Sequence, residues 1–121
     1  MAEITNIAEV DLNDFEEITW TDGAAGGQTF EFDVADERLL LLLWNDGTNE
    51  TNNITVTIEA GDMWQEAYGD ITVDLDQNEF YVAHFDSAVV KDEDGEVTID
   101  VQDTDPTDIQ IAIVKQSYSM P

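Results

Sequence analysis

The chain has 121 residues, of which 42% are hydrophobic, so it can form one domain with a real core and is too apolar for a disordered tail. It carries 29 Asp and Glu against 3 Lys and Arg, a formal net charge of −26, and it has no cysteine. Three cations cannot build the basic patch that nucleic acids or anionic membrane surfaces require, and without cysteine there is no disulfide or thiolate chemistry.

The acidic residues are spread from Glu3 to Asp108 rather than gathered in one tail. At low salt such charges repel one another, but the screening length falls from about 10 Å at 0.1 M salt to about 3 Å at 1 M. The composition therefore predicts adaptation to a salt-rich cytoplasm. A DNA mimic that blocks a basic cleft on another protein is the alternative, and it would need acids spaced like phosphates on one face.

Residues 1–26 are predicted to form an N-terminal arm or a short helix, followed by a glycine-rich joint. Leu12, Phe15 and Ile18 have the spacing of one helical face, and the stretch from Gly23 to Gly27 has the composition of a flexible joint. We expect this arm to reach a neighbouring subunit. Residues 27–121 are predicted to form the β-sandwich domain.

Apolar residues alternate with acids and threonines in four later segments, and with Gln110 and Ala112 in a fifth, which is the pattern of half-buried antiparallel strands. These segments are residues 30–34, 54–58, 71–75, 97–101 and 109–113. Turn residues separate the segments, including a predicted hairpin turn at Asp92–Gly95 in which Gly95 takes a positive φ. The predicted fold is all-β: a single antiparallel, jelly-roll-like β-sandwich of about seven or eight strands with an N-terminal arm.

Two segments, residues 39–44 and 80–85, are apolar on both faces. A strand of this kind needs cover beyond its own core, either from a loop or the N-terminal segment, or from another subunit. Trp44, Tyr81 and Phe85 are the large side chains that we expect at a subunit interface.

Candidate catalytic residues are few. His84 and Asp86 share a face of one predicted strand, but Ser87 would point the other way, so we interpret His84 as a partly buried structural residue. Asp92, Asp94 and Glu96 surround Gly95 without the ligand spacing of a calcium loop, which favours a plain acidic turn. The sequence predicts no enzyme, no catalytic residues, no cofactor and no metal site.

Asn49 and Asn53 each begin a glycosylation sequon, which matters only if the protein meets a glycosylating machinery.

From Arg38 onward the chain contains a series of strand and turn motifs: RLLLLLWNDG, ITVTIEAGD, GDITVDL, EFYVAHFDSAVV, DGEVTID and IQIAIV. Their order and spacing resemble a family of small β-sandwich proteins from the head-gene regions of tailed viruses and prophages. The turn residues Ala60-Gly61-Asp62, Gly69-Asp70 and Asp94-Gly95 match the family pattern. Two places depart from it: residues 63–66 have no proline, and HFDSAVV replaces a motif that usually contains arginine.

The resemblance implies a structural virion protein, a minor capsid or decoration (cement) protein that binds the outside of the viral head and stabilises it. Its implied partners are the major capsid protein and further copies of itself, with a trimer favoured, and it would be made in the host cytoplasm. Together with the charge, this indicates a tailed virus of a halophilic archaeon. The alternatives are another virion component of similar fold, such as a turret, vertex, tail-tube or fibre-base protein, and then an acidic intracellular binding module or DNA mimic.

Overall fold

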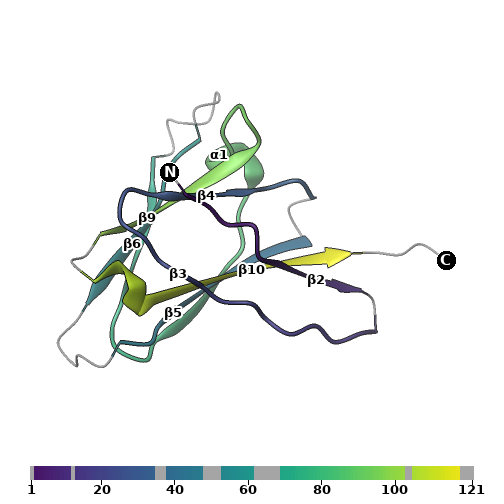
Figure 1. Cartoon of the computed structure of the whole chain (residues 1–121). Coiled ribbons are helices and arrows are strands. Elements are labelled where there is room, and N and C mark those ends of the chain that lie inside the picture. Colours follow the sequence, from purple (N-terminus) through teal and green to yellow (C-terminus); the bar gives the residue numbers. More distant parts are fainter. Residues whose placement is uncertain are drawn as a thin grey trace.

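The computed structural model describes residues 2–11, 13–34, 38–47, 53–61, 69–102 and 105–117, and this part of the chain is all-β with two five-stranded sheets (Figure 1). The first sheet has the order β1 (Ala2–Glu3), β4 (Gln28–Glu31), β9 (Glu96–Gln102), β6 (Ile54–Ile58) and β7 (Ile71–Leu75). The second has the order β2 (Ile7–Asp11), β10 (Ile109–Ser117), β5 (Leu39–Asn45) and β8 (Phe80–Ala83), and β3 (Thr21–Asp22) pairs with β10. A one-turn helix α1 (Ser87–Val90) and a 3-10 turn (Pro106–Asp108) lie in the connections.

One hydrophobic core joins the two sheets, because each strand turns alternate residues inward. In β5 the burial alternates strictly, with Leu39, Leu41 and Leu43 buried and the residues between them only partly covered. The fully buried side chains come from both sheets and include Phe30, Leu39, Leu41, Ile54, Leu75, Ile99, Ile109, Ile111 and Ile113. The two sheets therefore pack face to face.

The predicted strands are present, except that the segment 30–34 is a strand only up to Glu31, where β4 ends, and the prediction of purely antiparallel pairing is wrong in two places. β1 runs parallel to β4, and β2 runs parallel to β10, so both sheets are mixed. Both exceptions arise from the N-terminal segment, which first lies beside β4 and then crosses to the other sheet (Figure 1). Ile4 lies at this crossing, where its side chain is buried in the core and its N–H donates to the Thr29 carbonyl at 2.7 Å.

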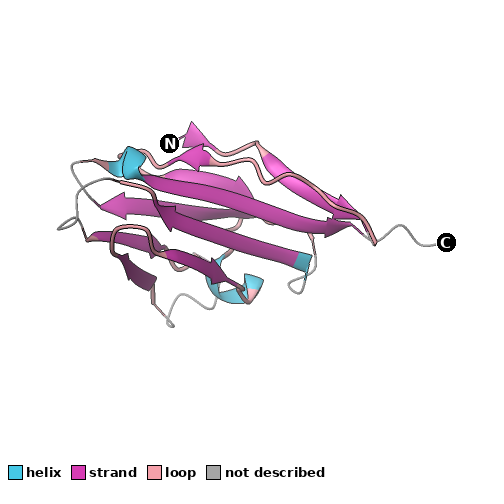
Figure 2. Ribbon diagram, turned by 90° about the horizontal axis from the view of Figure 1, so that it is seen from below, coloured by secondary structure: helices cyan, strands magenta, loops and turns pink. Residues whose placement is uncertain are grey.

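The later part of the predicted arm contacts its own chain from Trp20 onward, where Trp20 packs against Trp44 and β3 pairs with β10. Residues 13–20 contain no helix or strand, and Phe15 and Ile18 are exposed instead of forming a buried helical face; Leu12 lies outside the described residues. The glycine-rich stretch is fixed by Gln28, whose side chain accepts from the Ala24 N–H at 3.0 Å and donates to the Asp22 carbonyl at 2.9 Å. Figure 2 shows the second sheet from its outer side, with this segment running along it.

Candidate interaction surface

The strands β7 and β8 lie at the edges of the two sheets, on the same side of the molecule. A tight turn joins them, with Asn78 at a φ of +64°, but they belong to different sheets and do not pair with each other. Buried Asn45 holds this corner: its side chain donates to the Leu75 carbonyl at 3.1 Å, and its backbone N–H donates to the Glu79 carbonyl at 3.0 Å. No described strand closes the gap between the two edges.

An apolar pocket of about 130 Å³ lies in this gap. The inward-facing residues of both edge strands line it, since Ile71 and Val73 face Ile58 and Val56 in the first sheet, and Tyr81 and Ala83 face Leu43 and Leu41 in the second. The complete lining is Leu41, Leu43, Ile58, Ile71, Val73, Tyr81, Val82, Ala83 and Phe85. Within the described part of the chain, the core is therefore open on the side of β7 and β8.

On the other side of the molecule the N-terminal segment fills the equivalent position. There β1 and β2 add to the two sheets and Ile4 enters the core between them. The molecule thus covers one open side with its own chain and leaves the other side uncovered within the described residues.

The strand β8 exposes a run of large apolar side chains. Phe80 is 52% exposed, Tyr81 38% and Val82 61%, and Ile71 on β7 is 42% exposed. An edge strand is usually protected by a charge, a proline or a bulge, and the four residues of β8 contain neither charge nor proline. We call the exposed side chains of Ile71, Phe80, Tyr81 and Val82 the apolar edge.

The three predicted interface residues have different positions. Trp44 lies on the outer face of the second sheet and is partly covered by Trp20, with ring centroids 5.8 Å apart. Tyr81 belongs to the apolar edge. Phe85 is buried and lines the pocket, because the predicted strand 80–85 ends at Ala83 and the chain then turns inward.

One of the two explanations of the doubly apolar segments, cover by the N-terminal segment, applies to part of this face. Trp20 also contacts Phe80 edge-on, at a centroid distance of 5.4 Å, so the N-terminal segment does cap part of the second sheet. Sequence reasoning did not identify Trp20, Phe80, Val82 or Ile71. The two-sided apolar pattern of residues 80–85 pointed to the correct strand, but which of its residues stay exposed depends on the sheet order.

The outer face of the first sheet has the opposite character. Its outward positions carry acids and threonines, and Thr55 donates its hydroxyl to Asp74 across strands at 2.7 Å. These outward residues are Glu3, Thr29, Glu31, Thr55, Thr57, Thr72, Asp74, Glu96, Thr98 and Asp100. The molecule therefore has one acidic sheet face, whereas the outer face of the second sheet is largely apolar.

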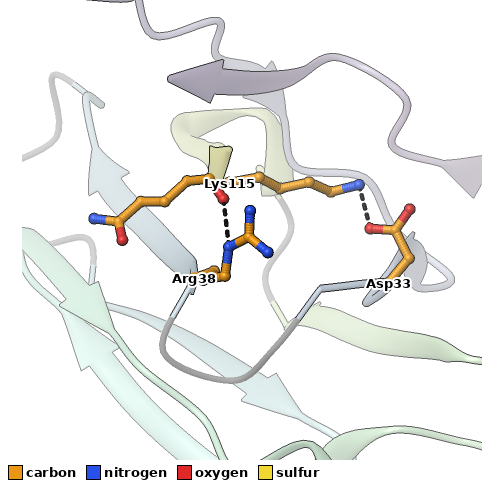
Figure 3. A network of polar contacts seen from close by, with 4 residues as sticks. Asp33, Arg38 and Lys115 are labelled. Atoms are coloured by element: carbon orange, nitrogen blue, oxygen red, sulfur yellow. Dashed lines mark hydrogen bonds and ion pairs between the residues drawn. The ribbon is translucent and has the colours of Figure 1, made fainter. Parts of the chain in front are cut away.

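All three cations of the chain have partners in the connection from β4 to β5 or next to it. Lys115 forms an ion pair with Asp33, and the Arg38 Nε donates to the Gln116 carbonyl at 2.9 Å (Figure 3). Lys91 lies over the Phe32 ring, 5.9 Å from its centroid. The hydrogen bond from Lys115 lowers the pKa of Asp33, more than partial burial raises it. The three cations thus stabilise the region around the connection from β4 to β5.

The residues weighed for catalysis or metal binding lie in the connection after β8 and in the turn that leads into β9. His84 is exposed just beyond β8, which corrects the expectation of a partly buried strand residue, and Asp86 beside it is also exposed. The Asp92 carboxylate accepts from the Asp94 and Glu96 backbone N–H groups, each at 2.9 Å, so it stabilises the turn. Gly95 has the expected positive φ of +83°, although the turn joins α1 to β9 and not two strands.

Among the described residues, no group of three or more histidine or acidic side chains could hold a metal ion. In the same part of the chain, no helix is long and apolar enough to span a membrane. Asn53 is exposed and donates its side-chain amide to Asp76 at 2.6 Å, whereas Asn49, Asp62 and residues 63–66 lie outside the described residues.

Comparisons with protein-family models, with curated proteins and with solved structures found no family, relative or structural neighbour that matches this chain.

Proposed function

We propose that this chain is a structural virion protein, a capsid decoration protein that binds the outside of a viral head and stabilises it without chemistry. The proposal includes the jelly-roll-like β-sandwich that the sequence motifs imply. The observation that carries it is the apolar edge on a molecule with a net charge of −26. Soluble monomers seldom leave adjacent large apolar side chains uncovered, so the apolar edge favours a protein that works in an assembly.

The different outer faces support an assembly with a defined orientation. The outer face of the first sheet carries Glu31, Asp74 and Asp100 between threonines, and such a face suits contact with concentrated salt solution. The apolar edge and the outer face of the second sheet suit contact with protein. A decoration protein needs both kinds of surface, because one side meets the lattice and the other meets the medium.

The resemblance to the head-gene β-sandwich family connects this assembly with a tailed virus. Under this proposal the major capsid protein is a partner, further copies of the chain are others, and the acidic surface reflects a halophilic host. Specific interfaces usually bury about 1,200–2,000 Å² in total, and many weak contacts on one lattice add up through multivalency.

The test is the copy number of this chain in virus particles purified in molar salt, measured by quantitative peptide mass spectrometry against the major capsid protein. A ratio near one, or a simple fraction such as one third, would support a decoration role across the lattice. A few copies per particle would contradict a role across the lattice and indicate a location at a vertex, turret or tail. Absence from the particles would refute a virion role.

A further inference from the structure

We propose that the free edge of β8 pairs with the same edge of a second copy, so that two chains form a two-fold dimer with one continuous sheet. This inference rests on the proposed function, in which the apolar edge is an assembly surface, and it names the partner at that surface.

The outward-facing backbone groups of β8 follow from its pairing with β5. The Asn45 N–H donates to the Glu79 carbonyl at 3.0 Å, so the Glu79 carbonyl faces β5. Because antiparallel ladders alternate, Tyr81 also directs its backbone groups to β5, and Phe80 and Val82 direct theirs to the free edge. Two residues of β8 thus offer both a donor and an acceptor to a further strand.

Along an antiparallel ladder, hydrogen-bonded and non-hydrogen-bonded residue pairs alternate. A two-fold axis between two residue pairs would make a hydrogen-bonded pair equivalent to a non-hydrogen-bonded one, which is impossible. The axis must therefore pass through a pair in which one residue lies opposite its own copy. With Tyr81 at the axis, Phe80 lies opposite Val82 of the second copy, once on each side of the axis. Each of these pairs exchanges two backbone hydrogen bonds and sets apolar side chains against one another. The sequence of β8 is therefore complementary to itself.

The same register covers the pocket. Tyr81 faces the inner side of the sheet and lines the pocket, so at the axis the Tyr81 ring of each copy lies beside the pocket of the other. The exposed apolar surface of the apolar edge is roughly 350 Å², from the exposed fraction of each side chain and the usual total area of such side chains. The side chains counted are Ile71, Phe80, Tyr81 and Val82. This is close to half of the roughly 800 Å² that each partner contributes to a stable interface.

Charge favours a second copy over a basic partner. The four residues of β8 carry no charge, and the Glu79 carboxylate beside them already accepts from the Tyr81 hydroxyl at 3.2 Å. In the dimer Glu79 would lie opposite Ala83 of the second copy rather than another acid. Two molecules of charge −26 repel at low salt, but molar salt screens that repulsion. Dimerisation should therefore strengthen as KCl rises, whereas binding to a basic partner would weaken.

Sedimentation velocity of the full chain tests the dimer. At 3 M KCl and about 100 μM chain we expect a particle of twice 13.5 kDa, and at 0.2 M KCl association at least tenfold weaker. Val82→Glu should be monomeric at 3 M KCl, whereas the matched control Phe15→Glu, at an exposed apolar residue away from β8, should dimerise like the parent chain. A monomeric parent chain at 3 M KCl, a trimer, or a dimeric Val82→Glu variant would overturn the proposal.

Crosslinking tests the register independently, because the chain has no cysteine of its own. Non-hydrogen-bonded pairs bring Cα atoms to about 4.5 Å, within disulfide range, so Tyr81→Cys should form an intermolecular disulfide under mild oxidation. Phe80→Cys should crosslink to Val82→Cys when the two variants are mixed, and much less to itself. Phe15→Cys serves as the control for random collision. Tyr81→Cys crosslinking no faster than Phe15→Cys would overturn the register, even if Val82→Glu fails to fold.

The dimer and the virion role can fail separately. Virus particles that contain the chain, together with a monomer in solution at 3 M KCl, would overturn the dimer alone. A dimer that is absent from virus particles would confirm the pairing and overturn the decoration role.

Discussion

The position of Ile4 predicts that the N-terminal segment stabilises its own domain. Its side chain is 3% exposed and belongs to the core between the two sheets. Ile4→Ala removes three buried carbons, worth about 2.4 kcal/mol in transfer free energy at roughly 0.8 kcal/mol each. The cavity left behind adds to this, so we expect a loss of about 3 kcal/mol, within the range of about 2–5 kcal/mol for such substitutions.

The assay is urea unfolding in 3 M KCl, followed by circular dichroism at one fixed chain concentration, since a dimer makes the midpoint depend on concentration. A slope near 2 kcal/mol per M urea converts the loss into a midpoint lower by about 1.5 M. Ile18→Ala is the matched control, because it makes the same chemical change at an exposed site of the N-terminal segment and should cost less than about 1 kcal/mol. If the two variants lose equal stability, Ile4 does not anchor the segment in the core and the reasoning fails.

Three further predictions concern charge and the aromatic cap. The Tm should rise by more than about 10 °C between 0.1 and 3 M salt, equally for NaCl and KCl, because screening relieves the repulsion; a flat response would contradict this. Burial, followed by the charges of Asp108 and Asp22, raises the pKa of Asp46 above 3.8, so ionised Asp46 destabilises the fold at neutral pH. Asp46→Asn should therefore raise the Tm at pH 7, and this advantage should disappear as the pH falls below 3.8, which thermal melts across pH can check. Trp20→Ala should cost about 1–2 kcal/mol and shift the remaining tryptophan emission to the red as Trp44 becomes exposed; an unchanged spectrum would show that Trp20 does not cover it.

The strands were predictable because alternation is a local signal. The predicted segments 54–58 and 71–75 coincide with β6 and β7, and 97–101 and 109–113 lie within β9 and β10. In each of these segments the apolar positions face the other sheet, which fixes the period of two in the sequence.

The N-terminal pairings were not predictable in the same way. The pairing of Ile7 with Ile113 joins opposite ends of the chain, and β1 has only two residues, too few for a periodic pattern. The contact between Trp20 and Trp44 is equally distant in sequence. Tertiary packing determines these contacts, so the sequence pattern of residues 1–26 fitted an arm or a helix as well as it fitted strands.

The candidate surface was predictable only as a strand, not as a set of residues. The apolar pattern of residues 80–85 indicated that both faces need cover, which led to Tyr81 and Phe85. Phe85 is in fact buried, because β8 ends before it, whereas Phe80 and Val82 are exposed because β8 is an edge strand that pairs with one neighbour among the described strands. The position of a strand in the sheet order depends on the other strands and cannot be predicted from the sequence of that strand alone.

The acidic face of the first sheet bears on the DNA-mimic alternative. A mimic needs carboxylates at regular phosphate-like spacing. Here Glu31 pairs directly with Glu96, but elsewhere threonines interrupt the acids: Thr29 pairs with Thr98, and Thr55 pairs with Asp74 and donates a hydrogen bond to it. Hydroxyl groups that bind neighbouring carboxylates reduce their accessibility to a basic protein and make a hydrated polar layer instead. This arrangement favours the proposals that the acids suit a salt-rich medium and that the apolar edge binds a partner. The two explanations predict opposite salt effects, because association through the apolar edge strengthens with KCl, whereas a complex with a basic protein weakens.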